Sequence, residues 1–367
     1  MAGDRTLRTA IVGLRHGHVG SFGPESPGYL HTLQHTAGVE IVAFCEDADP
    51  ARLQEARRHY PAAGIHTSVD DLIEQEDFEL AWVVLPAADV PRAGVKLAEA
   101  GKHFYMEKQF ARTSADLAEL VRAVRRHRVK VLPGYPHRFN PVARDLRRLI
   151  ERGVLGRPLD LEVRMVTGQV RSGVRDPSSF LYSREAEGGG VLHMLGGHYI
   201  DVMRFLMGDE VKAVQAMTGR PVGHIEAPLE DVITAALEFH NGAMGTIHAG
   251  YLQSTTRPYD SGLVFRGLDG EATWSPIGSP RLQVRSSAAE WSDAPERTFE
   301  YAFAPSPPGY TRGGLWMFNW IQDFIRAVQT GGEPQLTVED ALRVLQVIDA
   351  CYASARTGTR VEVSGLR

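Results

Sequence analysis

The sequence predicts an α/β protein of two domains: a doubly wound parallel sheet, then an α+β domain with an open, mainly antiparallel sheet. Three observations predict it. The 367 residues exceed one ordinary hydrophobic core. Up to about residue 130, short β-type runs alternate with segments of helical period. Beyond about residue 150, strands alternate apolar and polar residues instead. We place the domains at 1–130 and 131–367.

The first domain is expected to contain five strands and three clear helices. The continuous apolar run AWVVL at 81–85 is typical of a strand buried on both faces between helices. The predicted strands are 9–14, 40–45, 80–85, 103–106 and 130–132. The predicted helices are 50–59, 90–100 and 114–127.

In the second domain, residues 159–166 alternate as a half-buried strand does. Asn241-Gly242 predicts a hairpin between strands 233–239 and 243–249, and Asp269-Gly270 predicts another turn. The Pro/Ser/Gly-rich stretch 305–314 is expected to be a loop. Helices are predicted at 191–206, 316–330 and 337–357, the last with Thr337 as N-cap and Asp340 three residues on, close to a capping box.

Composition excludes several classes of partner. With a net charge of −5, 43% hydrophobic and 23% charged residues, we expect neither nucleic acid nor an anionic membrane as partner. No apolar run approaches the roughly 20 residues of a membrane helix, and the first residues lack a signal-peptide core. Two cysteines provide neither a disulfide framework nor a cysteine metal cage, so we expect a cytoplasmic protein without a metal site.

A glycine turn follows the first predicted strand. A dinucleotide fingerprint, G-x-G-x-x-G, lets backbone amides approach a diphosphate. Here only Gly13 falls in place, and Arg15 and His18 occupy the other two glycine positions. Together with His16 these residues offer charged contacts to phosphate in place of backbone donors. The alternative is a plain glycine-rich turn.

Glu46 ends the second predicted strand. A carboxylate there accepts both ribose hydroxyls of an adenosine and repels a 2′-phosphate, which favours NAD over NADP. Its distance along the chain from Gly13 exceeds the usual ~20 residues. An inserted loop at 21–29 would account for the excess. Alternatively, Glu46 and Asp47 are solvated turn acids.

Glu107 and Lys108 follow strand 103–106, where ligands of open α/β sheets lie. An ammonium there can polarise a substrate hydroxyl or share its proton. The alternative is a surface ion pair between the two residues.

The segment GGGVLHMLGGHYID, 188–201, stacks Met194, His198 and Asp201 on one helical face. His198 is therefore a candidate general base oriented by Asp201. Alternatively, it is a buried histidine that Asp201 merely satisfies. A metal set of His193, His198 and Asp201 is disfavoured, because His193 would point away from the others on an α-helix.

Taken together, these residues resemble the Gfo/Idh/MocA family of oxidoreductases. The markers are AIVGL at 10–14, AFCE at 43–46, VVLP at 83–86, AGKHFYMEK at 100–108, GYPHRFNP at 134–141, GRPLDLE at 156–162, segment 188–201, EFHNGAMGTIHAG at 238–250 and the C-terminal block 337–358. The resemblance implies a Rossmann domain that binds NAD or NADP, a sugar, inositol or other polyol substrate, and a homodimer or homotetramer formed through the open sheet.

The resemblance also implies residue roles. Lys108 matches the family's E-K-P motif and would bind the reacting hydroxyl, and His198 matches D-x-x-x-H and would be the acid/base. Expected to bind the cofactor are Gly13, Leu14, Arg15, His16, Glu46, Pro86, Glu107, Lys108 and Arg138. Expected to bind the substrate are His137, Arg138, His193 and His198.

Three further positions depart from the family pattern. Gln109 replaces the proline of E-K-P, Met194 replaces the aspartate of D-x-x-x-H, and Val90 replaces a cofactor-loop histidine. We expect an NAD(H)-dependent oxidoreductase of a sugar or polyol. The departures leave two alternatives: a relative that cleaves glycosides by transient oxidation and elimination, and a non-catalytic protein that senses the nucleotide.

Overall fold

The computed structural model describes residues 5–22, 28–171, 176, 178–253, 259–277, 280–304 and 316–363. By contacts the chain divides into two compact units. The first unit comprises Met1–Gly134 with Phe303–Leu342, and the second comprises Tyr135–Ala302 with Arg343–Arg367. The loop predicted at 305–314 lies outside the described residues.

The first unit is built on a six-stranded sheet of order β3-β2-β1-β4-β5-β6, in which all pairs are parallel. The strands are β1 Leu7–Val12, β2 Val39–Cys45, β3 Gly64–His66, β4 Leu80–Val83, β5 His103–Met106 and β6 Val131–Pro133. This strand order is that of the Rossmann fold and confirms the predicted doubly wound sheet. The prediction omitted β3, whose sequence Gly-Ile-His contains a single strongly apolar residue and so forms no apolar run.

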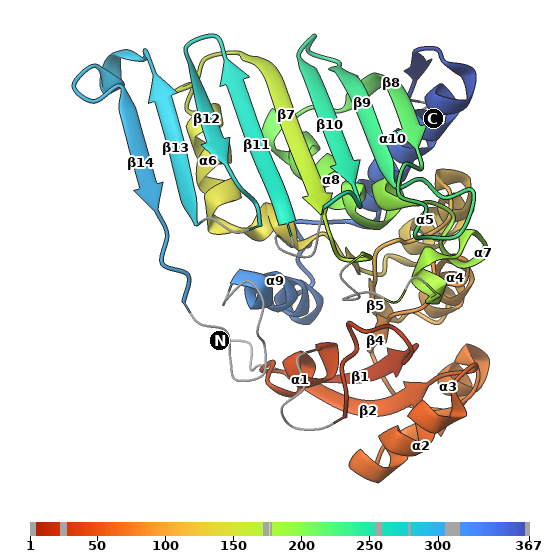
Figure 1. The fold of residues 1–367 in the computed structure, drawn as a ribbon. Helices are drawn as coiled ribbons and strands as arrows, with labels where there is room; N and C mark the ends of the chain where they lie inside the picture. Colours follow the sequence, from red (N-terminus) through yellow and green to blue (C-terminus); the bar gives the residue numbers. More distant parts are fainter. Residues whose placement is uncertain are drawn as a thin grey trace. The chain divides into compact units, whose positions relative to one another are not determined.

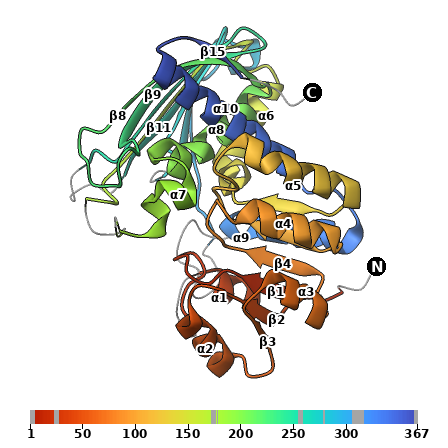
Figure 2. The same cartoon turned by 90° about the vertical axis from the view of Figure 1, so that its right-hand side faces the viewer.

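Helices connect these strands (Figure 2). They are α1 Tyr29–Gln34, α2 Pro50–His59, α3 Val69–Gln75, α4 Val90–Glu99 and α5 Ser114–His127, with α9 Trp316–Thr330 added from the C-terminal part. The side chains of Asp49, Ser68 and Thr113 accept backbone N–H groups at the starts of α2, α3 and α5. Within the unit, the Trp320 ring of α9 packs edge-on against Tyr105 of β5, with ring centroids 5.7 Å apart.

The second unit contains a nine-stranded sheet of order β14-β13-β12-β11-β7-β10-β9-β8-β15 (Figure 1). Only β7 and β10 pair in parallel among the described strands of this sheet. The predicted hairpin at Asn241-Gly242 joins β9 to β10, and Gly242 has a φ of +84°. The strands are β7 Pro158–Thr167, β8 Val211–Gly219, β9 Val232–Phe239, β10 Met244–Gly250, β11 Tyr259–Gly267, β12 Gly270–Trp274, β13 Arg281–Ser286, β14 Glu296–Glu300 and β15 Val361–Glu362.

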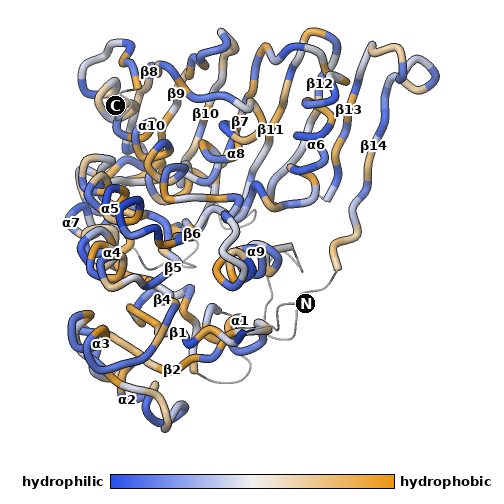
Figure 3. The backbone as a smooth tube through the Cα atoms, turned by 180° about the vertical axis from the view of Figure 1, so that it is seen from behind, coloured by the Kyte–Doolittle hydropathy of each residue, from blue (hydrophilic) through white to orange (hydrophobic). Residues whose placement is uncertain are grey.

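Helices α6 and α8 cover one face of this sheet (Figure 1). Buried and exposed positions alternate along strands such as β8 and β9, so the other face of the sheet is exposed. Figure 3 shows hydrophilic and hydrophobic residues mixed along these strands, and the exposed face carries mainly polar side chains with Met217 and Met244 among them. The helical segments are η1 Pro136–Phe139, α6 Pro141–Glu151, η2 Phe180–Tyr182, α7 Arg184–Glu187, η3 Leu192–Gly196, α8 Gly197–Met207, η4 Ala289–Trp291 and α10 Val338–Thr357, which begins in the first unit.

One predicted helix has a different form. Residues 191–206 were expected to be a single α-helix, but Leu192–Gly196 is a π-helix in which the Gly197 amide donates to the Leu192 carbonyl, five residues back. Among the described residues, no helix is both long and apolar enough to cross a membrane.

Candidate active site

The residues predicted for the site divide between the two units. The first unit holds Gly13, Leu14, Arg15, His16, Glu46, Pro86, Glu107 and Lys108. The second unit holds His137, Arg138, His193 and His198. Those of the first unit follow the carboxyl ends of β1, β2, β4 and β5, which is the edge where open parallel sheets bind ligands.

The glycine turn after β1 is tight. Gly13 has a φ of +89°, and a Cβ built on it would lie 2.5 Å from the Val84 carbonyl oxygen at the end of β4. Its amide donates to the Cys45 carbonyl at 2.9 Å. Because a side chain cannot occupy this position without moving backbone, glycine lets the loop lie close over the sheet edge.

Glu46 braces the loop that follows this turn. Its side chain is buried, with one carboxylate oxygen accepting the Leu14 amide at 2.7 Å and the other accepting the Ala48 amide at 2.8 Å. The Arg15 guanidinium lies 3.4 Å from the second oxygen. Glu46 is therefore not a solvated turn acid. A contact of Glu46 with ribose hydroxyls stays a prediction. Each carboxylate oxygen can still accept a further hydrogen bond from such a hydroxyl.

Arg52 on α2 is a loop residue that sequence reasoning missed. Its guanidinium donates to the Leu14 carbonyl at 3.1 Å and to the Gly20 carbonyl at 2.6 Å, which ties both ends of the loop to α2. No sequence signal distinguishes it from the other arginines of that helix.

Glu107 is a buried carboxylate surrounded by donors. One oxygen contacts His18 Nδ1 at 3.0 Å and accepts the Tyr29 hydroxyl at 2.9 Å and the Tyr105 hydroxyl at 3.0 Å, while the other accepts the Lys108 amide at 3.0 Å. Burial by itself would raise the pKa of Glu107. The charge and hydrogen bond of His18, with the smaller effects of the His16 and Lys108 charges, outweigh burial and hold that pKa well below its usual value.

Lys108 is itself only 7% exposed, so the alternative of a surface ion pair with Glu107 does not hold. The peptide bond between Lys108 and Gln109 is cis. Pro86 is also buried, and its carbonyl accepts the Asp89 and Val90 amides at the start of α4. The departure at position 90 thus places a buried valine in the first turn of that helix.

Nitrogen and oxygen atoms of His16, His18 and Glu107 lie within 4.8 Å of one another, a spacing that metal ions accept. The hydrogen bonds favour a different arrangement. His16 Nδ1 accepts the His18 amide at 3.0 Å, and three side chains already surround one Glu107 oxygen. We therefore describe these three residues as a hydrogen-bonded ion-pair cluster and assign no metal to them.

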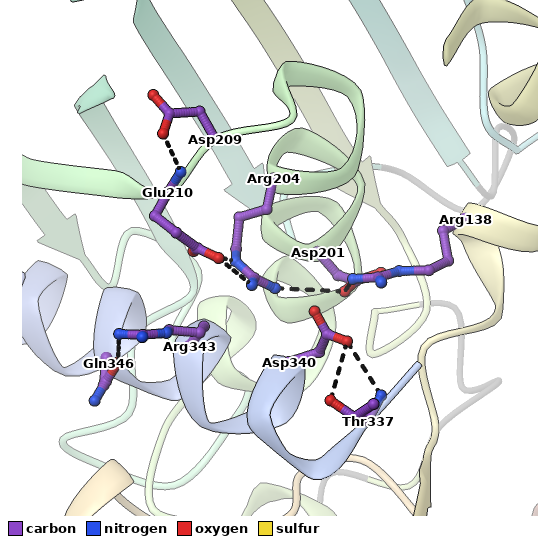
Figure 4. A network of polar contacts seen from close by, with 9 residues as sticks. All are labelled: Arg138, Asp201, Arg204, Asp209, Glu210, Thr337, Asp340, Arg343 and Gln346. Carbon is purple, nitrogen blue, oxygen red and sulfur yellow. Dashed lines mark hydrogen bonds and ion pairs between the residues drawn. The ribbon is translucent and has the colours of Figure 1, made fainter. Parts of the chain in front are cut away.

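In the second unit, an ion-pair network surrounds Asp201 (Figure 4). Asp201 is fully buried and accepts two hydrogen bonds from the Arg138 guanidinium, one of them from Nε at 3.0 Å. Arg204 lies 3.9 Å from the same carboxylate and makes two 2.7 Å bonds to Glu210. Arg138 and Asp201, expected to serve the cleft and His198, are thus engaged with each other.

Aromatic rings surround His198. Tyr135 and His137 meet it edge-on, with ring centroids 5.5 and 5.2 Å away. A Cβ on Gly197 would lie 2.7 Å from the Tyr135 hydroxyl, so a glycine before His198 allows this approach. Desolvation lowers the pKa of His137 to about 4 and raises that of Tyr135 well above its usual value.

Glu230 anchors the turn that precedes the π-helix, and sequence reasoning missed it. Its carboxylate accepts the Gly190 amide at 3.0 Å, the Leu192 amide at 2.9 Å and the Tyr352 hydroxyl at 3.0 Å. A Cβ on Gly190 would lie 2.2 Å from the Glu230 carbonyl oxygen. Gly190 therefore lets this carboxylate approach the helix that carries His193 and His198.

The π-helix changes the expected direction of His193. On an α-helix, residues five apart point about 140° away from each other. In a π-turn the hydrogen bond itself joins residues five apart, so His193 lies about one turn before His198. The reason for setting His193 aside as pointing away does not apply to this geometry.

Comparison with known families matches both parts of the chain. Residues 7–135 match a family described as an oxidoreductase family with an NAD-binding Rossmann fold. Residues 143–273 match the Gfo/Idh/MocA C-terminal domain.

Individual relatives span nearly the full length. Inositol 2-dehydrogenase 2 of Saccharopolyspora erythraea is 30% identical over 344 residues, covering 91% of each chain. D-apiose dehydrogenase of Paraburkholderia graminis is 28% identical over 349 residues, covering 93% of this chain and 88% of the relative. The solved structure of a levoglucosan dehydrogenase in complex with NADH and L-sorbose shares the fold, with a TM-score of 0.83 and 22% identity, over 99% of this chain and 100% of that one.

Proposed function

The chain belongs to the Gfo/Idh/MocA family of oxidoreductases with an NAD-binding Rossmann fold, and we propose that it transfers a hydride between NAD(H) and a hydroxyl-bearing carbon of a sugar, inositol or related polyol. The observation that carries this proposal is the carboxyl edge of the parallel sheet. There a tight Gly13 turn, the buried Glu46 and the buried Lys108 follow β1, β2 and β5.

The residues at this edge fit a nicotinamide dinucleotide. The Gly13 turn leaves no side chain between the loop and the end of β4, and Arg15 and His18 add charge where phosphate is expected. Glu46 would favour NAD over NADP by repelling a 2′-phosphate. When bound, the cofactor supplies the hydride acceptor or donor that no side chain provides.

Lys108 and His198 would divide the proton chemistry. The Lys108 ammonium would stabilise negative charge on the reacting oxygen, and the His198 imidazole would take the hydroxyl proton. The neighbours of His198 support this role, since Tyr135 and His137 restrict its ring and His137 stays neutral near pH 7.

The test measures binding and turnover separately. We expect NADH to bind the purified protein, and a panel of aldoses and inositols to include a substrate whose oxidation reduces NAD⁺. Lys108→Ala and His198→Ala should each lower kcat by a hundredfold or more at roughly unchanged NADH affinity. If the residues act in one step, the double variant should lose little more than either single variant. Full turnover in both single variants would contradict the assignment.

Met194 supports a second candidate function. Met194 stands in place of the aspartate of the family's D-x-x-x-H motif, so this chain has a different set of acid/base residues and could catalyse a different reaction. Transient oxidation of a ring carbon, elimination of an aglycone and return of the hydride would consume no added NAD. Chromatographic detection of released aglycone without added cofactor separates this activity from net dehydrogenation.

We also propose that the polar face of the nine-stranded sheet joins copies of this chain into a homodimer or homotetramer. Residues such as Thr246, exposed on β10, lie on this face beside Glu162 and Arg164 of β7. A cytoplasmic location is in keeping with Cys45 and Cys351, which are both buried and free.

A further inference from the structure

The dinucleotide site of the first unit contains a charge that should oppose its ligand; this inference rests on the proposed function. Glu107, 1% exposed, follows β5 at the carboxyl edge of the sheet. Its carboxylate reaches His18, in the loop after β1 where the diphosphate of a dinucleotide is expected. An uncompensated carboxylate so close would repel an anionic ligand, and low dielectric would strengthen the repulsion.

Most of the groups around Glu107 cannot cancel its charge. The Tyr29 and Tyr105 hydroxyls and the Lys108 amide donate hydrogen bonds but carry no net charge. The charges of His16 and Lys108 also lower the pKa of Glu107, but each does so less than the charge of His18. Of the side chains that the described part of the chain shows hydrogen-bonded to Glu107, the one that can gain a positive charge is His18, 3.0 Å away.

We propose that protonated His18 neutralises Glu107, so that the diphosphate of a nicotinamide dinucleotide can bind over the loop after β1. At a pH where His18 is neutral in the free protein, binding of the dinucleotide therefore takes up a proton. The His18 side chain is 31% exposed and can exchange protons with solvent, whereas the Glu107 side chain is only 2% exposed. The histidine at a fingerprint glycine position thus acquires a role that glycine cannot perform.

The other groups near His18 do not explain such a proton dependence. Arg15, paired with Glu46, and Arg52, bonded to loop carbonyls, keep their charge at every accessible pH. Among the described residues, the groups that face His18 or the Glu107 carboxylate are His16 in the same loop, Tyr29 on α1, and Tyr105 and Lys108 on or directly after β5.

Calorimetric titration of the full chain with NADH tests the proposal without any catalytic readout. Titrations at about pH 8, in buffers of different ionisation enthalpy, should reveal net uptake of up to one proton per NADH. NADH affinity should fall roughly tenfold between about pH 6 and pH 9. Adenosine, which lacks the diphosphate, should bind without this dependence. Zero uptake with constant NADH affinity would overturn the proposal, whereas no NADH binding at any pH would overturn the proposed function instead.

Variants locate the proton. His18→Gln should abolish the uptake and weaken NADH binding at every pH, since Glu107 then keeps its charge. The double variant His18→Gln/Glu107→Gln should regain affinity relative to His18→Gln, because the repelling carboxylate is gone. A double variant that binds no better than the single one would overturn the electrostatic explanation.

The matched control is His103→Gln. His103 is the first residue of β5, the strand that Glu107 follows, so it lies at the other end of that strand from Glu107. Its Nδ1 accepts the Lys130 amide at 2.8 Å. We expect His103→Gln to retain the proton uptake of the wild-type protein. Loss of the uptake in this variant, or its persistence in His18→Gln, would overturn the assignment to His18.

Discussion

Three buried carboxylates, Glu46, Glu107 and Asp201, show how single residues of this protein keep their charge away from water. A buried charge is costly unless hydrogen bonds or an opposite charge compensate it. Glu46 receives backbone amides, Glu107 receives an imidazole and two phenols, and Asp201 receives a two-bond guanidinium contact. Removing one partner from any of them should cost more than a surface ion pair is worth.

Met194 is the residue at which the chemistry of the family can be tested directly. It is 5% exposed and stands where D-x-x-x-H has its aspartate. For a dehydrogenase that lacks only this hydrogen-bonding group, Met194→Asp should raise kcat for polyol oxidation about tenfold. The buried carboxylate should also lower stability by about 1–3 kcal/mol. Met194→Asn, with the same shape and no charge, is the control, and equal rates in both variants would contradict a role for the carboxylate.

His137 should make stability depend on pH. Desolvation lowers its pKa to about 4 in the folded protein, whereas an unfolded histidine titrates near 6.5. Below about pH 6.5 the unfolded chain gains a proton that the folded chain takes up only near pH 4, so stability is complete above that window and is lost as the pH falls through it.

Between pH 7 and pH 5 the free energy of unfolding should therefore fall about 1–2 kcal/mol more in the wild-type protein than in His137→Gln. This figure is below the full effect because His137 as a whole residue is only half-buried. Urea titrations at the two pH values measure it, with the exposed His240→Gln as control. Equal slopes for wild type and His137→Gln would refute the prediction.

At the scale of elements, the π-turn η3 and its anchor Glu230 have the largest consequence for the site. The Gly190 and Leu192 amides lie at the start of the segment that leads into α8, and both donate to one buried side chain. Tyr352, on α10, donates to the same carboxylate. Glu230, which lies just before β9, therefore connects the start of η3 to α10. Burial raises the pKa of Glu230, although its hydrogen bonds act in the opposite direction.

Glu230→Ala should therefore destabilise this junction. Two backbone amides and a phenol lose their acceptor in a buried location, which should lower the free energy of unfolding by about 3 kcal/mol. Chemical denaturation measures the change, and the exposed Glu119→Ala on α5 is the control, expected within about 0.5 kcal/mol of wild type. A change in Glu230→Ala no larger than in Glu119→Ala would show that the anchor is dispensable.

Local signals in the sequence predict most elements of this fold. The helices 50–59, 114–127 and 316–330 and the strand 103–106 agree with the structure to the residue, because caps or clear periods define their ends. Asp340 accepts the Thr337 amide at 3.1 Å, which is one of the two hydrogen bonds of a capping box (Figure 4). The π-turn was not predicted, since its sequence has the same apolar period as an α-helix.

The candidate site was predictable only in part, because local sequence patterns mark some of its residues but not their partners. The catalytic candidates are polar residues at strand ends or in a glycine-rich segment, where position alone marks them. Their partners come from distant parts of the chain: His18 lies 89 residues from Glu107, and Arg138 lies 63 residues from Asp201. Such pairs depend on tertiary structure, and no local pattern encodes them.

At the scale of the whole molecule, strand order determines what each sheet can do. In the first unit, the order β1-β4-β5 brings together strand ends that are far apart in sequence, so Gly13, Pro86 and Glu107 follow neighbouring strands. In the second unit, helices cover one face of the sheet and the other is polar. A broad polar sheet face with no described helix upon it is suited to contact with a second copy of the chain.

Thr246→Arg tests that use of the open face. Thr246 is exposed on β10 and pairs in register with Glu162 of β7, so an arginine there gains an acidic neighbour and should leave the fold of one chain intact. In a two-fold symmetric contact, however, each copy would bring its new arginine to the same patch, and the like charges would oppose association. We expect light scattering after size exclusion to give an oligomer for the wild type and a smaller species for Thr246→Arg. Glu119→Arg, an exposed charge reversal on α5 of the first unit, should leave the mass unchanged. A monomeric wild type would contradict the proposed oligomer. An oligomer that persists in Thr246→Arg would show that the contact does not use this face of the sheet.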